Sequence, residues 1–168
     1  DENAAYPAYS QTELDSQLEN ATDNTVIAIP ATKSMKLSQT SVIKKNVILS
    51  GAGPDQTVLK TEDKNYLVAN DNVTIKNITI DGTGSSSMDD NGVIKFTGNN
   101  AVLDNVKVIG GGQDTYGHGV RMEVSKNGSS TIKNSVISGA FRGIQSFSLD
   151  GTLKIENTTL AAECYCLN

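Results

Sequence analysis

Short runs of alternating apolar and polar residues recur along the chain, and an asparagine stands inside or just before each of them. The clearest run is VTIKNITIDG, residues 73–82, which alternates on both sides of Asn77. Alternation with a period of two predicts half-buried β-strands, whereas asparagine is depleted within strands. The asparagine therefore indicates a bend between two strands, because asparagine tolerates the left-handed backbone conformation.

The same pattern returns at intervals of 23 to 31 residues. Five asparagines each follow a charged residue and precede a short alternating run: Asn46, Asn77, Asn105, Asn134 and Asn157. No long helical pattern separates these runs, so the repeat predicts a solenoid of stacked parallel strands. We expect the five asparagines to form one ladder, in which side-chain amides bond across coils and satisfy buried polar groups.

Two further columns follow from this alignment. The third residue after each asparagine is always aliphatic and is expected to face the core: Leu49, Ile80, Val108, Ile137 and Leu160. The residue before each asparagine is charged, and from Lys76 onward the signs alternate: Lys45, Lys76, Asp104, Lys133 and Glu156. Stacked opposite charges support neighbouring strands, so we interpret this row as structural.

The N-terminal segment reads as a helix rather than a strand. Ser10 and Glu13 form a capping-box pattern, and Leu14 and Leu18 then share one helical face. We expect a single domain with a tail at 1–9, a capping helix at 10–22 that covers the open first coil, and β-helix coils at 23–168.

These features resemble the right-handed parallel β-helix of the pectin-lyase-like superfamily, whose coils carry an asparagine ladder at such a bend. The resemblance covers residues 24–168. It implies an all-β, right-handed parallel β-helix of about six coils. The superfamily includes pectate lyases, polygalacturonases, phage tailspikes, adhesins and binding modules, so the resemblance indicates the fold more specifically than the activity.

A candidate binding row lies on the third strand of each coil. Aligning these strands by their glycine starts places four outward residues on adjacent coils: Lys95, Arg121, Gln145 and Tyr165. Cations and amides suit uronate carboxylates and sugar hydroxyls, and an aromatic ring stacks on a sugar face. Tyr116 and Arg142, from the adjoining loops, extend the row. The pattern predicts binding of an acidic polysaccharide.

A catalytic alternative comes from a partial resemblance to polygalacturonases. These enzymes carry an Asp-Asp before one strand, a Gly-His-Gly one coil later and an Arg-Ile-Lys beyond, and this chain has Asp89-Asp90, Gly117-His118-Gly119 and RGIQ from Arg142. The resemblance implies that Asp89 and Asp90 act as acid and base, with His118 supporting them. However, NYLVAND stands where an Asn-Thr-Asp is expected, and no pectate-lyase motif is recognisable.

The same acidic residues suggest a metal alternative. Asp89, Asp90 and Asp114 supply carboxylate oxygens of the kind that Ca²⁺ prefers. A calcium site therefore stays open beside the catalytic interpretation.

The net charge and hydropathy of the chain restrict the kinds of partner that we expect it to bind. The 168 residues carry a net charge of −5 with a pI near 4.8, which argues against nucleic acid or an anionic membrane as the main partner. No apolar run approaches the ~18 residues that a membrane span needs. We therefore expect an extracellular or cell-surface module that binds carbohydrate without cleaving it. A structural or adhesive module and a degenerate polygalacturonase or pectate lyase are the alternatives.

The C-terminal segment ECYCLN raises two expectations. Cys164 and Cys166 stand at i and i+2, a poor geometry for a disulfide within one strand, so we expect two small core residues. The segment also stops in mid-coil without a cap. Uncapped edges recruit partners, so either the native chain continues or two copies meet end to end through residues 160–168 as a homodimer.

Overall fold

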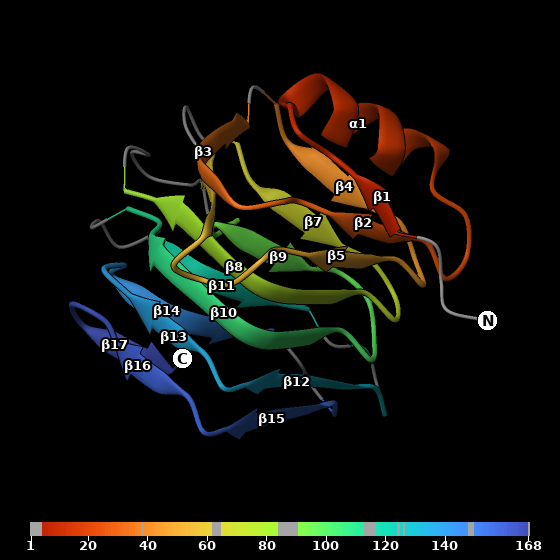
Figure 1. The fold of residues 1–168 in the computed structure, drawn as a ribbon. Helices are drawn as coiled ribbons and strands as arrows, with labels where there is room; N and C mark the ends of the chain where they lie inside the picture. The colour runs from red at the N-terminus through yellow and green to blue at the C-terminus, as the bar shows by residue number, and fades with distance from the viewer. Residues whose placement is uncertain are drawn as a thin grey trace.

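The computed structural model of the protein describes residues 5–37, 39–61, 65–83, 91–112, 117–123, 125, 127–147 and 150–167. The chain winds into a parallel β-solenoid of about six turns, with one short helix near the N-terminus (Figure 1). The predicted all-β solenoid with an N-terminal helix is therefore confirmed.

The strands form three stacks, and every described strand pair is parallel. The first stack contains β1 (Ala5–Pro7), β2 (Val26–Ala28), β5 (Ile48–Ser50), β8 (Thr74–Gly82), β10 (Val102–Gly110), β12 (Ser129–Lys133) and β15 (Thr152–Glu156). The second stack contains β3 (Thr32–Leu37), β6 (Thr57–Thr61), the later halves of β8 and β10, β13 (Val136–Ser138) and β16 (Thr159–Ala161). The third stack contains β4 (Ser41–Ile43), β7 (Leu67–Ala69), β9 (Ile94–Phe96), β11 (His118–Met122), β14 (Arg142–Ser146) and β17 (Tyr165–Leu167).

The core runs along the axis of the solenoid. Aliphatic residues pair with aliphatic residues on successive coils: Ile75 pairs with Leu103, and Leu103 with Ile132, all fully buried. Ile80, Val108 and Ile137 form a similar buried column in the second stack. Because each strand alternates, the residues between these columns face outward.

The asparagines form two stacks rather than one. Every non-glycine residue with positive φ in the described ranges is an asparagine. Those between the third and first stacks are Asn24, Asn46, Asn72, Asn100 and Asn127, and those between the first and second stacks are Asn77, Asn105, Asn134 and Asn157. The prediction that Asn46 lies beside Asn77 is wrong: Leu49 pairs with Ile75 rather than Ile80, so Asn46 falls beside Asn72.

Side-chain hydrogen bonds within both stacks fit an asparagine ladder. In one, Asn72 Nδ2 donates to Asn46 Oδ1 at 2.8 Å; in the other, Asn105 Nδ2 donates to Asn77 Oδ1 at 2.9 Å. Asn134 departs from the pattern and donates to Asp104 Oδ1 at 2.9 Å. Most of these side chains are exposed rather than buried. The left-handed corner, more than burial of polar groups, explains why asparagine stands there.

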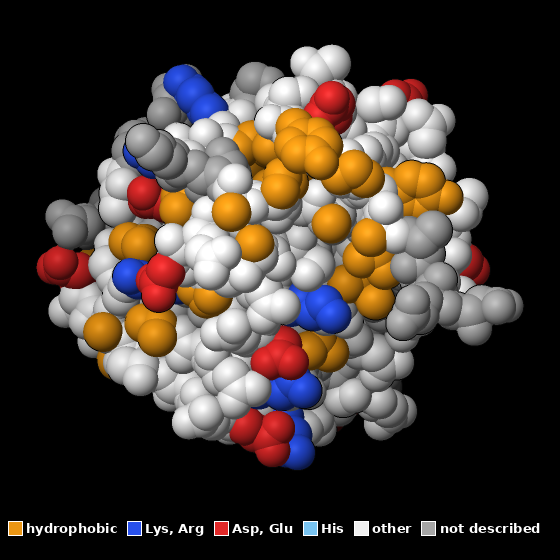
Figure 2. All heavy atoms as spheres, viewed as in Figure 1, with side chains coloured by type: hydrophobic (Ala, Val, Ile, Leu, Met, Phe, Trp, Pro, Cys, Tyr) orange, Lys and Arg blue, Asp and Glu red, His pale blue; other side chains and the backbone are white. Residues whose placement is uncertain are grey.

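The alternating charge row lies on the first stack. Lys76, Asp104, Lys133 and Glu156 are in register on adjacent coils, and Lys133 Nζ lies 3.4 Å from Asp104 Oδ2. Figure 2 shows a column of alternating blue (Lys, Arg) and red (Asp, Glu) side chains near the lower centre of this face. Lys45 does not belong to this column, because its neighbour Asn46 occupies the other corner.

The helix α1 (Gln11–Asn20) covers the N-terminal end of the stacks (Figure 1). Ser10 Oγ accepts a hydrogen bond from the Glu13 amide at 3.2 Å, and Glu13 Oε2 accepts one from the Tyr9 amide at 2.7 Å. Leu14 and Leu18 are buried and join the solenoid core. The expected tail at 1–9 contains β1, which pairs with β2 and adds a strand to the first stack.

The last described coil differs from the expectation in register and burial. β17 pairs Tyr165 with Arg142 and Leu167 with Ile144, three residues away from the predicted alignment. This register places an aliphatic side chain beside Ile144, where the prediction placed Cys164. Cys164 and Cys166 are exposed free thiols, so the predicted core cysteines are wrong.

Candidate carbohydrate-binding face

The outward row of the third stack brings together three of the predicted ligand-binding residues. Lys95, Arg121 and Gln145 are in register on β9, β11 and β14. Towards the N-terminus the row continues through Val42 and Val68 on β4 and β7. The polar part of the row is therefore confined to the C-terminal half of the solenoid.

A carboxylate that the sequence analysis missed lies between the two cations. Glu123 Oε1 is 2.9 Å from Arg121 Nε and 3.6 Å from Lys95 Nζ. Glu123 occupies the next outward position after Arg121, so strand alternation alone indicates its direction. The pairing orients both cations and leaves the three groups with one net positive charge.

An aromatic ring covers the other side of the arginine. The Arg121 guanidinium lies 4.1 Å from the centre of the Phe147 ring, a cation–π contact. Phe147 is 45% exposed and follows β14 at the position after Ser146. Its ring is thus both a support for Arg121 and an apolar surface open to a ligand.

A second arginine–aromatic cluster adjoins the row. The Arg142 guanidinium lies 5.9 Å from the ring centres of both Phe141 and Tyr165, and these two rings meet edge to face at 6.3 Å. Tyr165 was expected beside Gln145, but the register of β17 places it beside Arg142. Its ring is 48% exposed.

Gln145 is 9% exposed, and its Oε1 accepts a hydrogen bond from Arg142 Nη1 at 3.4 Å. The amide therefore links the row to the Arg142 cluster. We refer to Lys95, Arg121, Glu123, Arg142, Phe147 and Tyr165 as the cation–aromatic face.

Of the residues predicted to act in catalysis or to bind a metal, the structure describes only His118. His118 begins β11, is fully buried and is in register with Arg142, so its side chain does not face solvent. Asp89, Asp90, Asp114 and Tyr116 lie outside the described residues. Within the described ranges, no cluster of three or more His, Cys, Asp or Glu side chains is arranged to hold a metal ion.

Comparison with protein-family models and with curated proteins finds no match. In the part of the chain that the structure describes, no helix combines the length and the apolar character needed to traverse a bilayer. A β-solenoid is compatible with a carbohydrate-binding or surface module. The case for a function therefore depends on the cation–aromatic face.

Proposed function

We propose that this protein is an extracellular or cell-surface β-helix of the pectin-lyase-like type that binds an acidic, uronate-containing polysaccharide without cleaving it. The observation that supports this most is the stacking of Lys95 and Arg121 on adjacent coils beside exposed aromatic rings. Among the described residues that define this face, three cations, Lys95, Arg121 and Arg142, outnumber one carboxylate, that of Glu123, although the whole chain is acidic.

The two parts of the face suit different parts of a sugar polymer. The cations attract uronate carboxylates through charge-assisted hydrogen bonds, while Phe147 and Tyr165 offer apolar rings to the carbon faces of the sugars. Coils repeat every ~4.8 Å along the solenoid, so a polymer lying along the axis meets one contact per coil. Individually weak contacts then add through multivalency.

Glu123 sets the expected strength of binding. An incoming uronate competes with Glu123 for Lys95 and Arg121, so each contact exchanges one carboxylate for another. We therefore expect modest affinity per sugar and strong weakening by salt, because the charges are partly solvent-exposed.

The test compares polygalacturonate with a neutral glucan by isothermal titration calorimetry, using Arg121→Gln as the probe. Lys107→Gln is the matched control, since Lys107 belongs to the same coil but faces outward from the second stack. We expect Arg121→Gln to weaken polygalacturonate binding roughly tenfold and Lys107→Gln to leave it unchanged. Equal binding of the neutral glucan, or equal effects of the two variants, would contradict the proposal.

The catalytic alternative is tested separately. Incubation with polygalacturonate is followed by sensitive detection of new reducing ends and of unsaturated uronates. We expect neither product to form. Product that disappears in Asp89→Asn would instead identify a degenerate polygalacturonase.

We also propose that two copies associate through the apolar coil at the C-terminal end, residues 160–168. Leu167 is 55% exposed on β17, whereas Ile144 and Val120, in the same column of the inner coils, are buried. Light scattering across a concentration series is expected to show self-association that Leu167→Lys removes. A monomer at all concentrations would exclude the homodimer and leave the polysaccharide proposal unaffected.

A further inference from the structure

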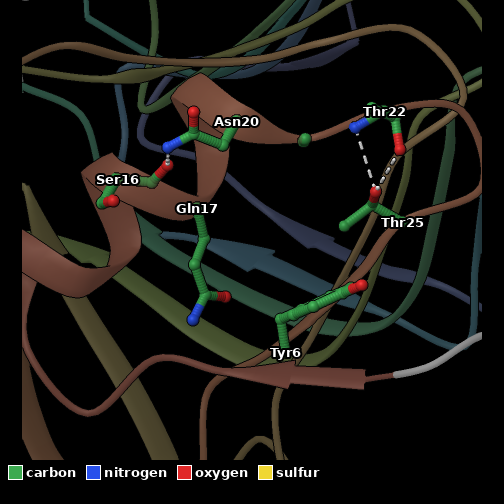
Figure 3. Close-up of a pocket in the computed structure, with 7 residues that line it drawn as sticks. Tyr6, Ser16, Gln17, Asn20, Thr22 and Thr25 are labelled. Carbon is green, nitrogen blue, oxygen red and sulfur yellow. Dashed lines mark hydrogen bonds between the residues drawn. The ribbon is translucent and has the colours of Figure 1, made fainter.

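A cavity of about 330 Å³ lies near the N-terminal end of the solenoid, away from the cation–aromatic face. It is open to solvent and is lined by the C-terminal half of α1, by β1 and by residues 21–25 (Figure 3). Its polar lining residues are Tyr6, Ser16, Gln17, Asn20, Thr22 and Thr25. The volume is at the small end of the range for ligand pockets, so it suits one small ligand.

The described side chains that line the cavity are uncharged. Amides, hydroxyls and one phenol provide its polar groups, and no Asp, Glu, Lys or Arg is among the lining residues that the structure describes. A charged ligand would find no counter-ion here, and desolvating it would be unfavourable. A neutral ligand rich in hydroxyl groups fits this lining.

Gln17 gives the cavity a specific requirement. Its Nε2 donates to the Pro7 carbonyl, which fixes the orientation of the amide. Its Oε1 is buried and accepts no hydrogen bond within the described residues. Leaving a buried acceptor unsatisfied is unfavourable, so a ligand that brings a hydroxyl donor to Gln17 Oε1 is favoured.

Tyr6 supplies a flat apolar surface next to this acceptor. Tyr6 is 52% exposed, and its ring extends from β1 towards the Thr22–Thr25 turn (Figure 3). That turn is held by a hydrogen bond from the Thr22 amide to Thr25 Oγ1 at 3.0 Å. Asn20 Nδ2 donates to the Ser16 carbonyl at 2.7 Å, which leaves its Oδ1 as a further acceptor.

We propose that this cavity binds a single uncharged saccharide residue, with Tyr6 against one face of the sugar ring and Gln17 Oε1 accepting a hydrogen bond from a ring hydroxyl. An aromatic ring beside planar amides matches the two surfaces of a pyranose, its carbon faces and its equatorial hydroxyls. The site is independent of the cation–aromatic face and differs from it in ligand charge.

Saturation-transfer NMR and NMR titration test the proposal on the whole chain, with methyl glucoside, methyl galactoside, methyl N-acetylglucosaminide and galacturonate as probes. We expect at least one neutral glycoside to shift the amide signals of Tyr6 and Gln17 with a Kd in the range of roughly 1 mM, and galacturonate to shift these two signals only at roughly tenfold higher concentration or above. Tyr6→Ala and Gln17→Leu are each expected to weaken the neutral glycoside several-fold.

Two matched variants control for structural damage. Tyr9→Ala removes a tyrosine that is 70% exposed, three residues along the chain and outside the lining. Gln11→Leu removes another glutamine of α1 whose Oε1 is also buried and unpartnered, but which does not line the cavity. Both are expected to bind like the native chain.

Three results would overturn the proposal: no saturation transfer from any neutral glycoside, galacturonate shifting the Tyr6 and Gln17 amide signals as readily as the neutral probes do, or equal loss in the lining and control variants. None of these bears on polygalacturonate binding at the third stack, so the two proposals fail separately.

Discussion

Two rows of charged side chains run along the same solenoid and are built differently. On the first stack, Lys76, Asp104, Lys133 and Glu156 alternate in sign from coil to coil. On the third stack, Lys95 and Arg121 place like charges on adjacent coils. Stacked opposite charges favour the fold, whereas stacked like charges oppose it. The like-charged row is the better candidate for binding, because Lys95 and Arg121 do not stabilise each other.

The two rows also differ in how they are neutralised. In the first stack Lys133 meets Asp104 of the neighbouring coil at 3.4 Å, and Glu156 meets Lys154 of its own strand at 2.8 Å. In the third stack one carboxylate, Glu123, serves both cations from an adjoining position, and Phe147 covers the arginine. The same strand spacing therefore supports a self-complementary column on one face and a cationic surface on another.

Reversing charge on the third stack has the largest expected effect. The double substitution Lys95→Glu and Arg121→Glu places two carboxylates beside that of Glu123. We expect polygalacturonate affinity to fall roughly a hundredfold or more. Calorimetric titration gives the dissociation constant, and circular dichroism verifies the fold. Lys133→Glu makes the same kind of change on the first stack and is expected to leave the affinity unchanged. If Lys133→Glu weakens binding as much, the two rows do not differ in function.

Substitution of Asn105, which forms the corner directly after Asp104, has the next largest expected effect, a loss of stability. Asn105 has φ of 55°, so Asn105→Ala forces alanine into the left-handed region and is expected to cost ~1–2 kcal/mol of unfolding free energy. Asn105→Gly loses the side-chain hydrogen bond to Asn77 but adopts this backbone freely, so its loss should be smaller. Urea denaturation measures both. An equal loss in the two variants would show that the amide ladder, whose hydrogen bond both variants lose, stabilises the corner more than the backbone conformation does.

Charge reversal on the first stack should reduce stability without affecting binding. Lys133→Glu places three like charges in succession, because Asp104 and Glu156 flank the position. We expect a loss of ~1 kcal/mol in unfolding free energy at low ionic strength, and a smaller loss in high salt because exposed charges are screened. Urea denaturation at two salt concentrations checks this. A loss that does not depend on salt would point to packing rather than charge.

Removing the shared carboxylate gives the smallest and most informative effect. Glu123→Gln is expected to tighten polygalacturonate binding several-fold, because the competitor for Lys95 and Arg121 is gone. It is also expected to lower unfolding free energy by ~0.2–1 kcal/mol, since two like charges then oppose each other. Opposite signs of the two changes would sharpen the contrast between the rows. Weaker binding in this variant would mean that Glu123 itself contacts the ligand.

The architecture was predictable because its signals are local. Strand alternation and left-handed asparagine are properties of a few consecutive residues, and Ser10 with Glu13 marks the start of α1 within one turn. The alignment of coils was less predictable. Two corners carry the same short pattern, so Asn46 could not be assigned to its true neighbour Asn72 without the pairing of Leu49 with Ile75.

The candidate site was predictable only in part. Alternation placed Lys95, Arg121 and Gln145 on one row, and the structure brings them into register. The outward direction of Glu123 and Phe147 follows from the same alternation, but their contacts with Lys95 and Arg121 of neighbouring coils are visible only in the structure. Tyr165 was misplaced because the predicted alignment set it 20 residues after its neighbour Gln145, whereas the register of β17 pairs it with Arg142, 23 residues earlier in the chain. The N-terminal cavity depends on α1 meeting β1, which no local pattern reports.

The most direct test of the central claim is to map polyuronate binding onto the two faces by backbone amide NMR. Short galacturonate oligomers are titrated into the native chain, and chemical-shift changes are followed residue by residue. The account predicts changes concentrated at Lys95, Arg121 and Phe147 on the third stack, with Lys76 and Lys133 on the first stack unaffected. Changes centred on the first stack, or no changes at all at saturating oligomer, would contradict it.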